Sequence, residues 1–210
     1  MYALYYSPGS AAMVVHQSLI ETGAPFELRT VDLAAREHKT PEYLKLNPNG
    51  VVPTLLLDDR PYFECSAMLL LLAERHPEAK LAPPVGSPLR PAYVQWMFHI
   101  ANSIQPSFRE WFNPKDFDAS EAEAETVKAV AWRRIEASWN RVSAHLTANG
   151  PYMLGDTPST CDFYVTMLMR WSRGMPKPAT QWPALNALAT HIKARPSWKR
   201  MCEEQKLPDW

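Results

Sequence analysis

The chain has 210 residues, of which 46% are hydrophobic and 21% charged, and its 22 Lys and Arg equal its 22 Asp and Glu. This length suits two domains, and the composition is typical of a globular protein rather than a disordered or fibrous one. Because the formal net charge is zero, we expect no overall electrostatic attraction to nucleic acid or to an anionic membrane.

The N-terminus and the cysteines predict a cytoplasmic protein. Residues 1–15 lack the basic segment and following apolar segment of a signal peptide. The longest apolar run, around Met68–Ala73, is far shorter than the roughly 20 residues that span a bilayer. Cys65, Cys161 and Cys202 are an odd number at wide spacing, which indicates a reducing compartment rather than a disulfide framework. No His/Cys group has metal-ligand spacing, so no metal site is expected.

The first 76 residues alternate between strand patterns and helix patterns. The predicted strands are Tyr2–Tyr6, Phe26–Val31, Thr54–Leu57 and Tyr62–Phe63, and the predicted helices are Ser10–Thr22, Pro41–Leu46 and Cys65–Arg75. Ser7-Pro8-Gly9 and Asn47-Pro48-Asn49-Gly50 are strong turn signals, and Gly23 ends a helix. The predicted order is therefore β-α-β-α-β-β-α over residues 1–76.

The rest of the chain is predicted to be helical. Residues 77–91 form a linker, with four prolines in Leu81–Pro91, and residues 92–210 form an all-helical domain. Its predicted helices are Ala92–Trp111, Ser120–Ala148, Thr160–Arg173, Pro183–Arg195 and Ser197–Glu204. Ser159 and Asp162 have the spacing of a capping box at a helix start, which is a structural feature rather than a chemical one.

Three segments and the order of elements resemble cytosolic glutathione S-transferases, particularly bacterial ones. The segments are Asn47–Pro53 (NPNGVVP), Glu64–Met68 (ECSAM) and Pro158–Phe163 (PSTCDF), and the resemblance covers essentially the whole chain. It implies a thioredoxin-like α/β domain that binds glutathione and an all-α domain that forms the site for the second substrate. It also implies a homodimer with a role in detoxification.

The resemblance assigns several residues to glutathione. They are His38, Lys39, Val52, Pro53, Glu64, Cys65 and Ser66. In the family the proline after Val is cis, and the backbone before it pairs with the cysteinyl part of glutathione. Glu64 would accept from the ligand's ammonium group, and the N–H groups of the following helix would bind its glutamyl carboxylate. His38 and Lys39 would bind its glycine carboxylate, unless they are only solvated charges of a loop.

Position 65 departs from the family pattern. Resembling proteins usually have serine here, and a thiol is a poor hydrogen-bond donor. The backbone N–H of Cys65, with Ser66 nearby, is therefore expected to do most of the anchoring.

Two side chains compete for the role of activating the glutathione thiol, which must become a thiolate. Ser10 matches the serine of serine-type classes, and Tyr6 is the second candidate; Ser7 or a backbone amide is the remaining possibility. The bacterial beta class has Cys one residue later, where this chain has Ala11, so mixed-disulfide chemistry is not expected. Ser10 could instead be an N-cap, which would compete with sulfur for the hydroxyl and leave the backbone N–H for the thiolate.

The second substrate is expected to be a small apolar electrophile held by an aromatic pocket. The candidate lining residues are Ala11, Trp96, His99, Phe108 and Trp111, any of which could instead belong to the core. His99 is expected to be a satisfied interior histidine rather than a base.

The leading hypothesis is a glutathione transferase that uses glutathione as co-substrate, with no tightly bound cofactor, no nucleic acid and no membrane partner. Its thiolate would attack the electrophile by substitution or addition. One alternative is a glutathione-dependent thiol reductase or peroxidase, which Ala11 opposes and Cys65 leaves open. Another is a non-catalytic glutathione-binding or ligand-binding protein.

Overall fold

The computed structural model describes residues 1–117 and 120–210, without the side chains of Phe117, Glu121 and Ala122, and it divides into two compact units. The first unit contains residues 1–87 and 193–210, and the second contains residues 88–192. The C-terminal segment thus groups with the N-terminal residues, whereas the sequence analysis placed it in the helical domain. The physical reason is that helix α9 (Pro196–Glu204) packs on helix α1 (Ala12–Thr22).

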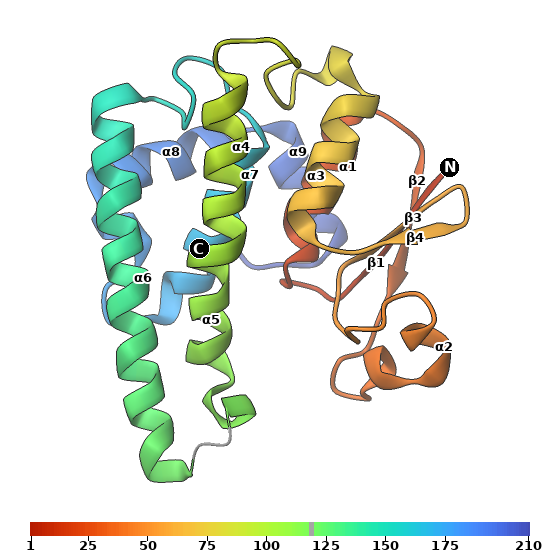
Figure 1. The fold of residues 1–210 in the computed structure, drawn as a ribbon, viewed down its shortest axis with the longest axis vertical. Helices are drawn as coiled ribbons and strands as arrows, with labels where there is room; N and C mark the ends of the chain where they lie inside the picture. Colours follow the sequence, from red (N-terminus) through yellow and green to blue (C-terminus); the bar gives the residue numbers. More distant parts are fainter. Residues whose placement is uncertain (118–119) are drawn as a thin grey trace. The chain divides into compact units, whose positions relative to one another are not determined.

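A four-stranded mixed sheet forms the centre of the first unit (Figure 1). Its strands are β1 (Tyr2–Tyr6), β2 (Phe26–Thr30), β3 (Thr54–Leu57) and β4 (Arg60–Tyr62), in the spatial order β2-β1-β3-β4. β1 is parallel to β2 and antiparallel to β3, and β4 is antiparallel to β3. Every residue of β3 is buried, as expected of a central strand that is apolar on both faces, whereas all of the edge strand β4 is exposed.

Helices cover both faces of this sheet. Neighbouring side chains of a strand point to opposite faces. Tyr6 contacts His16 of α1, while Tyr5 contacts Tyr43 of α2 (Pro41–Leu44), so these helices lie on opposite faces. Helix α3 (Cys65–Arg75) packs against α1. The predicted thioredoxin-like order β-α-β-α-β-β-α is confirmed.

Helix α1 is surrounded on all sides. Every residue from Ala11 to Leu19 is buried, including the polar residues His16, Gln17 and Ser18. The helix stops at Gly23, which has a φ of 68° that glycine adopts without strain. Buried polar groups need hydrogen-bond partners, and several of these come from the C-terminal segment.

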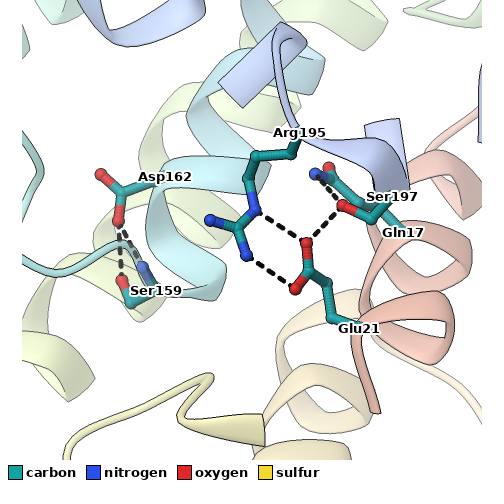
Figure 2. Close-up of polar contacts among 6 residues, drawn as sticks. All are labelled: Gln17, Glu21, Ser159, Asp162, Arg195 and Ser197. Carbon is teal, nitrogen blue, oxygen red and sulfur yellow. Dashed lines mark hydrogen bonds and ion pairs between the residues drawn. The ribbon is translucent and has the colours of Figure 1, made fainter. Parts of the chain in front are cut away.

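Arg195 ties the start of α9 to the end of α1 (Figure 2). Its Nε and Nη2 each donate to one oxygen of Glu21 at 2.7 Å, and the Ser197 hydroxyl also donates to Glu21. Gln17 donates to the Ser197 Oγ at 3.3 Å. Burial alone would raise the pKa of Glu21, but the hydrogen bonds from Arg195 and Ser197 hold it below its usual range. The bidentate, charge-assisted hydrogen bonds between Arg195 and Glu21 attach α9 strongly to α1.

The second unit is built of helices. They are α4 (Arg90–His99), α5 (Gln105–Phe112), α6 (Glu121–Asn149), α7 (Thr160–Trp171) and α8 (Pro183–Lys193), whose last residue is grouped with the first unit. Short 3₁₀ turns lie at η1 (Glu37–Lys39), η2 (Pro77–Ala79), η4 (Pro114–Phe117), η5 (Ser172–Gly174) and η6 (Ala179–Gln181). Helix α7 is buried from Thr160 to Arg170, as expected for a central helix of an all-α unit.

The helix predicted over Ala92–Trp111 is interrupted by a π-helical turn, η3 (Ile100–Ile104). Pro106 lies in the first turn of α5 and has no N–H to donate to the carbonyl four residues earlier. The wider π turn accommodates this missing hydrogen bond, so the helical path continues into α5.

The predicted capping box at the start of α7 is confirmed (Figure 2). The Asp162 carboxylate accepts from the Ser159 N–H at 2.7 Å, from the Ser159 hydroxyl at 2.9 Å and from the Met153 N–H at 2.7 Å. Asp162 is fully buried. Burial raises its pKa to about 6 against the opposing effect of these hydrogen bonds. One side chain therefore joins the start of α7 to the loop before it.

We expect Asp162→Ala to lower the free energy of unfolding by about 3 kcal/mol or more, because it leaves buried donors without an acceptor. Urea denaturation measures this loss. The matched control is Glu123→Ala in the exposed capping box of α6, where Glu123 accepts from the Ser120 N–H at 2.8 Å. Its expected cost is about 1 kcal/mol or less. Equal losses in the two variants would contradict the importance of burial at Asp162.

Candidate active site

The turn after β1 presents Ser10 at the start of α1. The Ser10 N–H donates to the Ser7 carbonyl at 3.1 Å and closes the turn, in which Gly9 has a φ of 74°. The Ser10 Oγ accepts from the Ala12 N–H at 3.3 Å. The N-cap of α1 is Ala11, without a side-chain hydrogen bond, so Ser10 is not the N-cap. Because the contact with Ala12 uses an oxygen lone pair, the hydroxyl hydrogen of Ser10 can still be donated. The backbone N–H of Ser10 is already used by the turn, so it cannot serve a thiolate as expected.

The first residue before α3 has an unusual backbone conformation. Glu64 is exposed and has φ 73° and ψ 113°, a region that non-glycine residues rarely adopt. Such conformations cluster at ligand sites because the surrounding structure must hold them in place. No hydrogen bond from a side chain caps α3 in the described part of the chain, and Ser66 in its first turn is buried.

Cys65 connects the starts of two helices. Its side chain is 6% exposed, and its Sγ donates to the Ala11 carbonyl at 3.6 Å. The N-terminus of α3 therefore lies against the N-terminus of α1. Glu64 and Ser66 are brought close to Ser10 by this contact between neighbouring residues.

The Val52–Pro53 peptide is cis, as the family resemblance implies. Thr54 pairs with Tyr5 across the antiparallel β1 and β3, so Pro53 lies beside the end of β1 from which the Ser10 turn begins. Within residues 1–117 and 120–210, the N–H and C=O of Val52 have no hydrogen-bond partner. The carbonyl of Val51, in contrast, accepts from Tyr43 Oη and Asn47 Nδ2, each at 2.8 Å. The loop is thus fixed around a peptide with a free donor and a free acceptor.

His38 and Lys39 lie against the same loop. The Lys39 ammonium is 3.5 Å from the Asn49 carbonyl and only 2.9 Å from where a Cβ on Gly50 would sit. Burial lowers the pKa of His38, and the charges of Lys39 and Arg36 lower it further. His38 is therefore neutral at physiological pH, and Lys39 supplies the positive charge of the pair.

Tyr6, the second candidate donor, lies on the α1 face of the sheet. It is 7% exposed, and its ring is 6.3 Å from the His16 imidazole. The Tyr6 carbonyl accepts from the Val31 N–H at 2.7 Å. Tyr6, Ser10 and Glu64 thus lie at the C-terminal end of β1 and at the starts of α1 and α3.

The aromatic candidates divide between core and surface of the second unit. Phe108 is fully buried among Phe112, Trp139 and Trp171, so its ring belongs to the core. Trp111 is half-buried. Phe112, which is 51% exposed, presents an aromatic surface that stacks on Phe108.

Trp96 and His99 lie on α4 and contact each other, with ring centres 5.6 Å apart. Trp96 also packs on His145 of α6 at 4.5 Å. Burial lowers the pKa of His99, and the charge of Arg141, whose Nη1 is 3.5 Å from its Nε2, lowers it further. His99 is half-buried rather than interior, and whether it has a chemical role stays untested. The remaining candidate, Ala11, is buried in the first unit at 8% exposure.

A chain of hydrogen bonds reaches the Ser10 turn from the C-terminal segment, and the sequence analysis missed it. The Gly9 N–H donates to Gln205 Oε1 at 3.1 Å, and Gln205 Nε2 is 3.0 Å from His16 Nδ1. His16 Nε2 is 2.8 Å from Glu204 Oε2. The partners are 188 to 196 positions apart, and no local pattern could have identified them.

No group of three or more His, Cys, Asp or Glu side chains in residues 1–117 and 120–210 could hold a metal ion. In that same part of the chain, no helix has the length and apolar character needed to cross a membrane.

Comparisons with known proteins identify the family of the chain. The chain matches the family models of the glutathione S-transferase N-terminal domain over residues 4–80 and C-terminal domain over residues 107–204. It is 31% identical over 171 residues to the glutathione S-transferase GstA of Escherichia coli O157:H7, covering 80% of this chain and 81% of that protein.

Solved structures agree as well. A glutathione transferase from Methylococcus capsulatus superimposes with a TM-score of 0.87 at 31% identity, covering 98% of this chain and 99% of that one. A glutathione transferase homologue from Sulfitobacter, with bound glutathione, superimposes with a TM-score of 0.91 at 26% identity, covering 99% of both chains. The chain belongs to the glutathione S-transferase family.

Proposed function

We propose that the protein is a glutathione transferase in which Ser10 stabilises the glutathione thiolate for attack on a small apolar electrophile. The observation that carries the proposal is the contact between Cys65 and Ala11, which joins the starts of α3 and α1. The Glu64 carboxylate, which suits an ammonium group, is thereby a neighbour of the Ser10 hydroxyl, which suits an anion. Both lie beside the unpaired peptide groups of Val52.

This arrangement matches the chemistry of a tripeptide with charged ends. The Glu64 carboxylate suits the ammonium group of the γ-glutamyl residue, and the first turn of α3, with Ser66, suits its carboxylate. The N–H and C=O of Val52 would pair with the cysteinyl residue as an added strand. Lys39 would bind the glycine carboxylate through a charge-assisted hydrogen bond.

Thiolate formation sets the energetic requirement. A free thiol has a pKa of about 8.5, and lowering it by two units requires roughly 2.7 kcal/mol of preferential stabilisation of the anion. The Ser10 hydroxyl can donate to sulfur while its oxygen accepts from the Ala12 N–H, and the α1 N-terminus adds a favourable dipole. The thiol proton passes to solvent, and the thiolate sulfur then forms a bond to the electrophilic carbon. In substitution the leaving group departs with the electron pair of its bond to that carbon; in addition the electron pair of the double bond is displaced to the neighbouring atoms, which take a proton from solvent.

The electrophile site is a proposal of the same kind. The half-exposed aromatic rings Trp96 and Trp111 and the exposed Phe112 offer apolar surface for such a substrate. The fully buried Phe108 supports this surface from the core. The homodimer expected from the family remains a prediction, which light scattering tests.

We expect Ser10→Ala to raise the thiol pKa of bound glutathione by about one to two units, because a hydroxyl donor to the anion is lost. Thiolate absorbance followed against pH measures it. Tyr6→Phe and Ser7→Ala are the matched hydroxyl deletions and should change the pKa little. A low pKa that is lost in Tyr6→Phe instead would move the role to Tyr6. Bound glutathione that titrates like the free tripeptide in the wild type would favour the non-catalytic binding protein.

We expect Glu64→Ala to raise the KM for glutathione about tenfold or more while kcat changes little, because a charge-assisted contact to the ammonium group is lost. Steady-state kinetics with varied glutathione separates the two constants. Asp59→Asn is the control, because Asp59 is an exposed acid with a comparably positive φ of 64° outside the proposed site. A KM in Glu64→Ala equal to that of the control would remove Glu64 from the ligand site.

The reductase alternative depends on a reactive thiol at Cys65. Cys65 and Cys161 are buried, and burial raises the pKa of Cys161 well above its usual value, whereas Cys202 is half-buried. We expect a disulfide reagent to modify Cys202 first in the folded protein, and the other two only after unfolding. Mass spectrometry of the labelled peptides identifies the site. Rapid labelling of Cys65 in the native protein would revive the reductase hypothesis.

A further inference from the structure

Gln205 joins the C-terminal end of α9 to the turn that carries Ser10. It follows α9 directly, is 2% exposed, and its N–H donates to the Met201 carbonyl at 3.0 Å. Its side-chain amide has two partners in the first unit. Oε1 accepts from the Gly9 N–H at 3.1 Å, and Nε2 lies 3.0 Å from His16 Nδ1.

The chemistry of the partners allows one arrangement of protons. A backbone N–H can only donate, so Gly9 must face the amide oxygen, and the amide NH₂ must then face His16. His16 Nδ1 is therefore an acceptor, and the ring proton lies on Nε2, which donates to Glu204 at 2.8 Å. The other oxygen of Glu204 accepts from Arg200 Nε at 2.7 Å. Burial lowers the pKa of His16, in agreement with the neutral ring that this arrangement requires.

This chain of hydrogen bonds fixes a peptide that could otherwise turn over. Pro8 and Gly9 are the central residues of the turn that the Ser10 N–H and Ser7 carbonyl close. The two common turn types with proline in this place differ by a flip of the peptide between the central residues. The φ of 74° at Gly9 belongs to one of them, and the hydrogen bond to Gln205 holds the Gly9 N–H in the direction this type requires.

Both candidate donors lie next to this network. Ser10 follows Gly9 in the chain, and the Tyr6 ring is 6.3 Å from His16. The attachment of α9 does not depend on Gln205 alone, because Arg195 and Ser197 already bind Glu21 at the other end of the helix. Gln205 is thus the part of the α1–α9 contact that reaches the turn.

We propose that Gln205 is a positioning residue for the thiolate-stabilising turn: it holds the Pro8–Gly9 peptide in place through the Gly9 N–H, and His16 orients its amide. The inference rests on the function proposed above. It assigns to the C-terminal segment a part in activating glutathione, without contact between Gln205 and the reacting sulfur.

The test compares Gln205→Met with Ser197→Ala. Methionine has a similar length but cannot make either hydrogen bond, whereas Ser197→Ala weakens the α1–α9 contact away from the turn. For each variant we would measure the melting temperature, the thiol pKa of bound glutathione, kcat and KM for glutathione, and the hydrogen exchange of the Gly9 amide by NMR. Both variants are expected to melt at lower temperature than the wild type.

Gln205→Met alone is expected to raise the bound thiol pKa by about half a unit to one unit and to lower kcat about three- to tenfold, with KM for glutathione nearly unchanged. Its Gly9 amide should also exchange faster. The proposal is overturned if the thiol pKa and kcat of Gln205→Met match those of Ser197→Ala, or if Gly9 exchange is unchanged. If the wild type itself does not lower the thiol pKa, the proposed function fails and this inference with it. The wild-type titration alone therefore distinguishes the two failures.

Discussion

The first unit depends on how the polar side chains of α1 are satisfied inside the protein. Residues 11–19 of this helix are buried on every face, and a helix of that kind would normally be apolar all round. His16 and Gln17 are fully buried, and the His16 ring and the Gln17 NH₂ group find partners in α9 or directly after it, whereas Gln17 Oε1 has none among the described residues. Since an unpaired buried polar group costs about 1–3 kcal/mol, the hydrogen bonds from the C-terminal segment stabilise α1 in its place. Hydrogen bonding, rather than apolar contact alone, thus defines where the C-terminal segment lies.

The same constraint orders the candidate site. The turn at Ser7–Ser10 begins at the central strand β1 and ends at α1, so both of its ends are held by buried elements. Its middle is held by Gln205, and the start of α1 is held to α3 by Cys65. A loop fixed at three places has little freedom, which is what stabilising an anion requires of its donors. The proposed chemistry therefore draws on residues near both ends of the sequence.

Local pattern was sufficient to predict most elements and the family. Strand alternation, proline and glycine turns and the capping spacing are interactions between neighbours in sequence, and three strands, α3 and the Asp162 box appeared close to where they were predicted. The edge strand was predicted at Tyr62–Phe63 but lies at Arg60–Tyr62, and α1 begins at Ala12 rather than at Ser10. The contacts between distant segments were not predicted. The packing of α9 on α1 is one of them, because an amphipathic pattern does not say which surface covers the helix. The hydrogen-bond partners of His16 and Gly9 could not be predicted for the same reason. The π turn before Pro106 was not predicted because it arises from a single missing N–H donor within a continuous helical pattern.

Position 65 shows how the chain uses a departure from its family's pattern. A serine there would offer a hydroxyl to a ligand carboxylate, whereas the Cys65 thiol is turned toward the Ala11 carbonyl and is buried. Sulfur is a weak donor, so the contact contributes mainly by filling space between the two helix starts. In the proposed complex, the glutamyl carboxylate would therefore bind to the backbone N–H groups of α3 and to Ser66. These groups are rigid parts of a helix, so they can bind a carboxylate without first losing side-chain freedom. The proposed site thus replaces one mobile donor with fixed ones, in keeping with a turn and two helix starts that are all held by buried contacts.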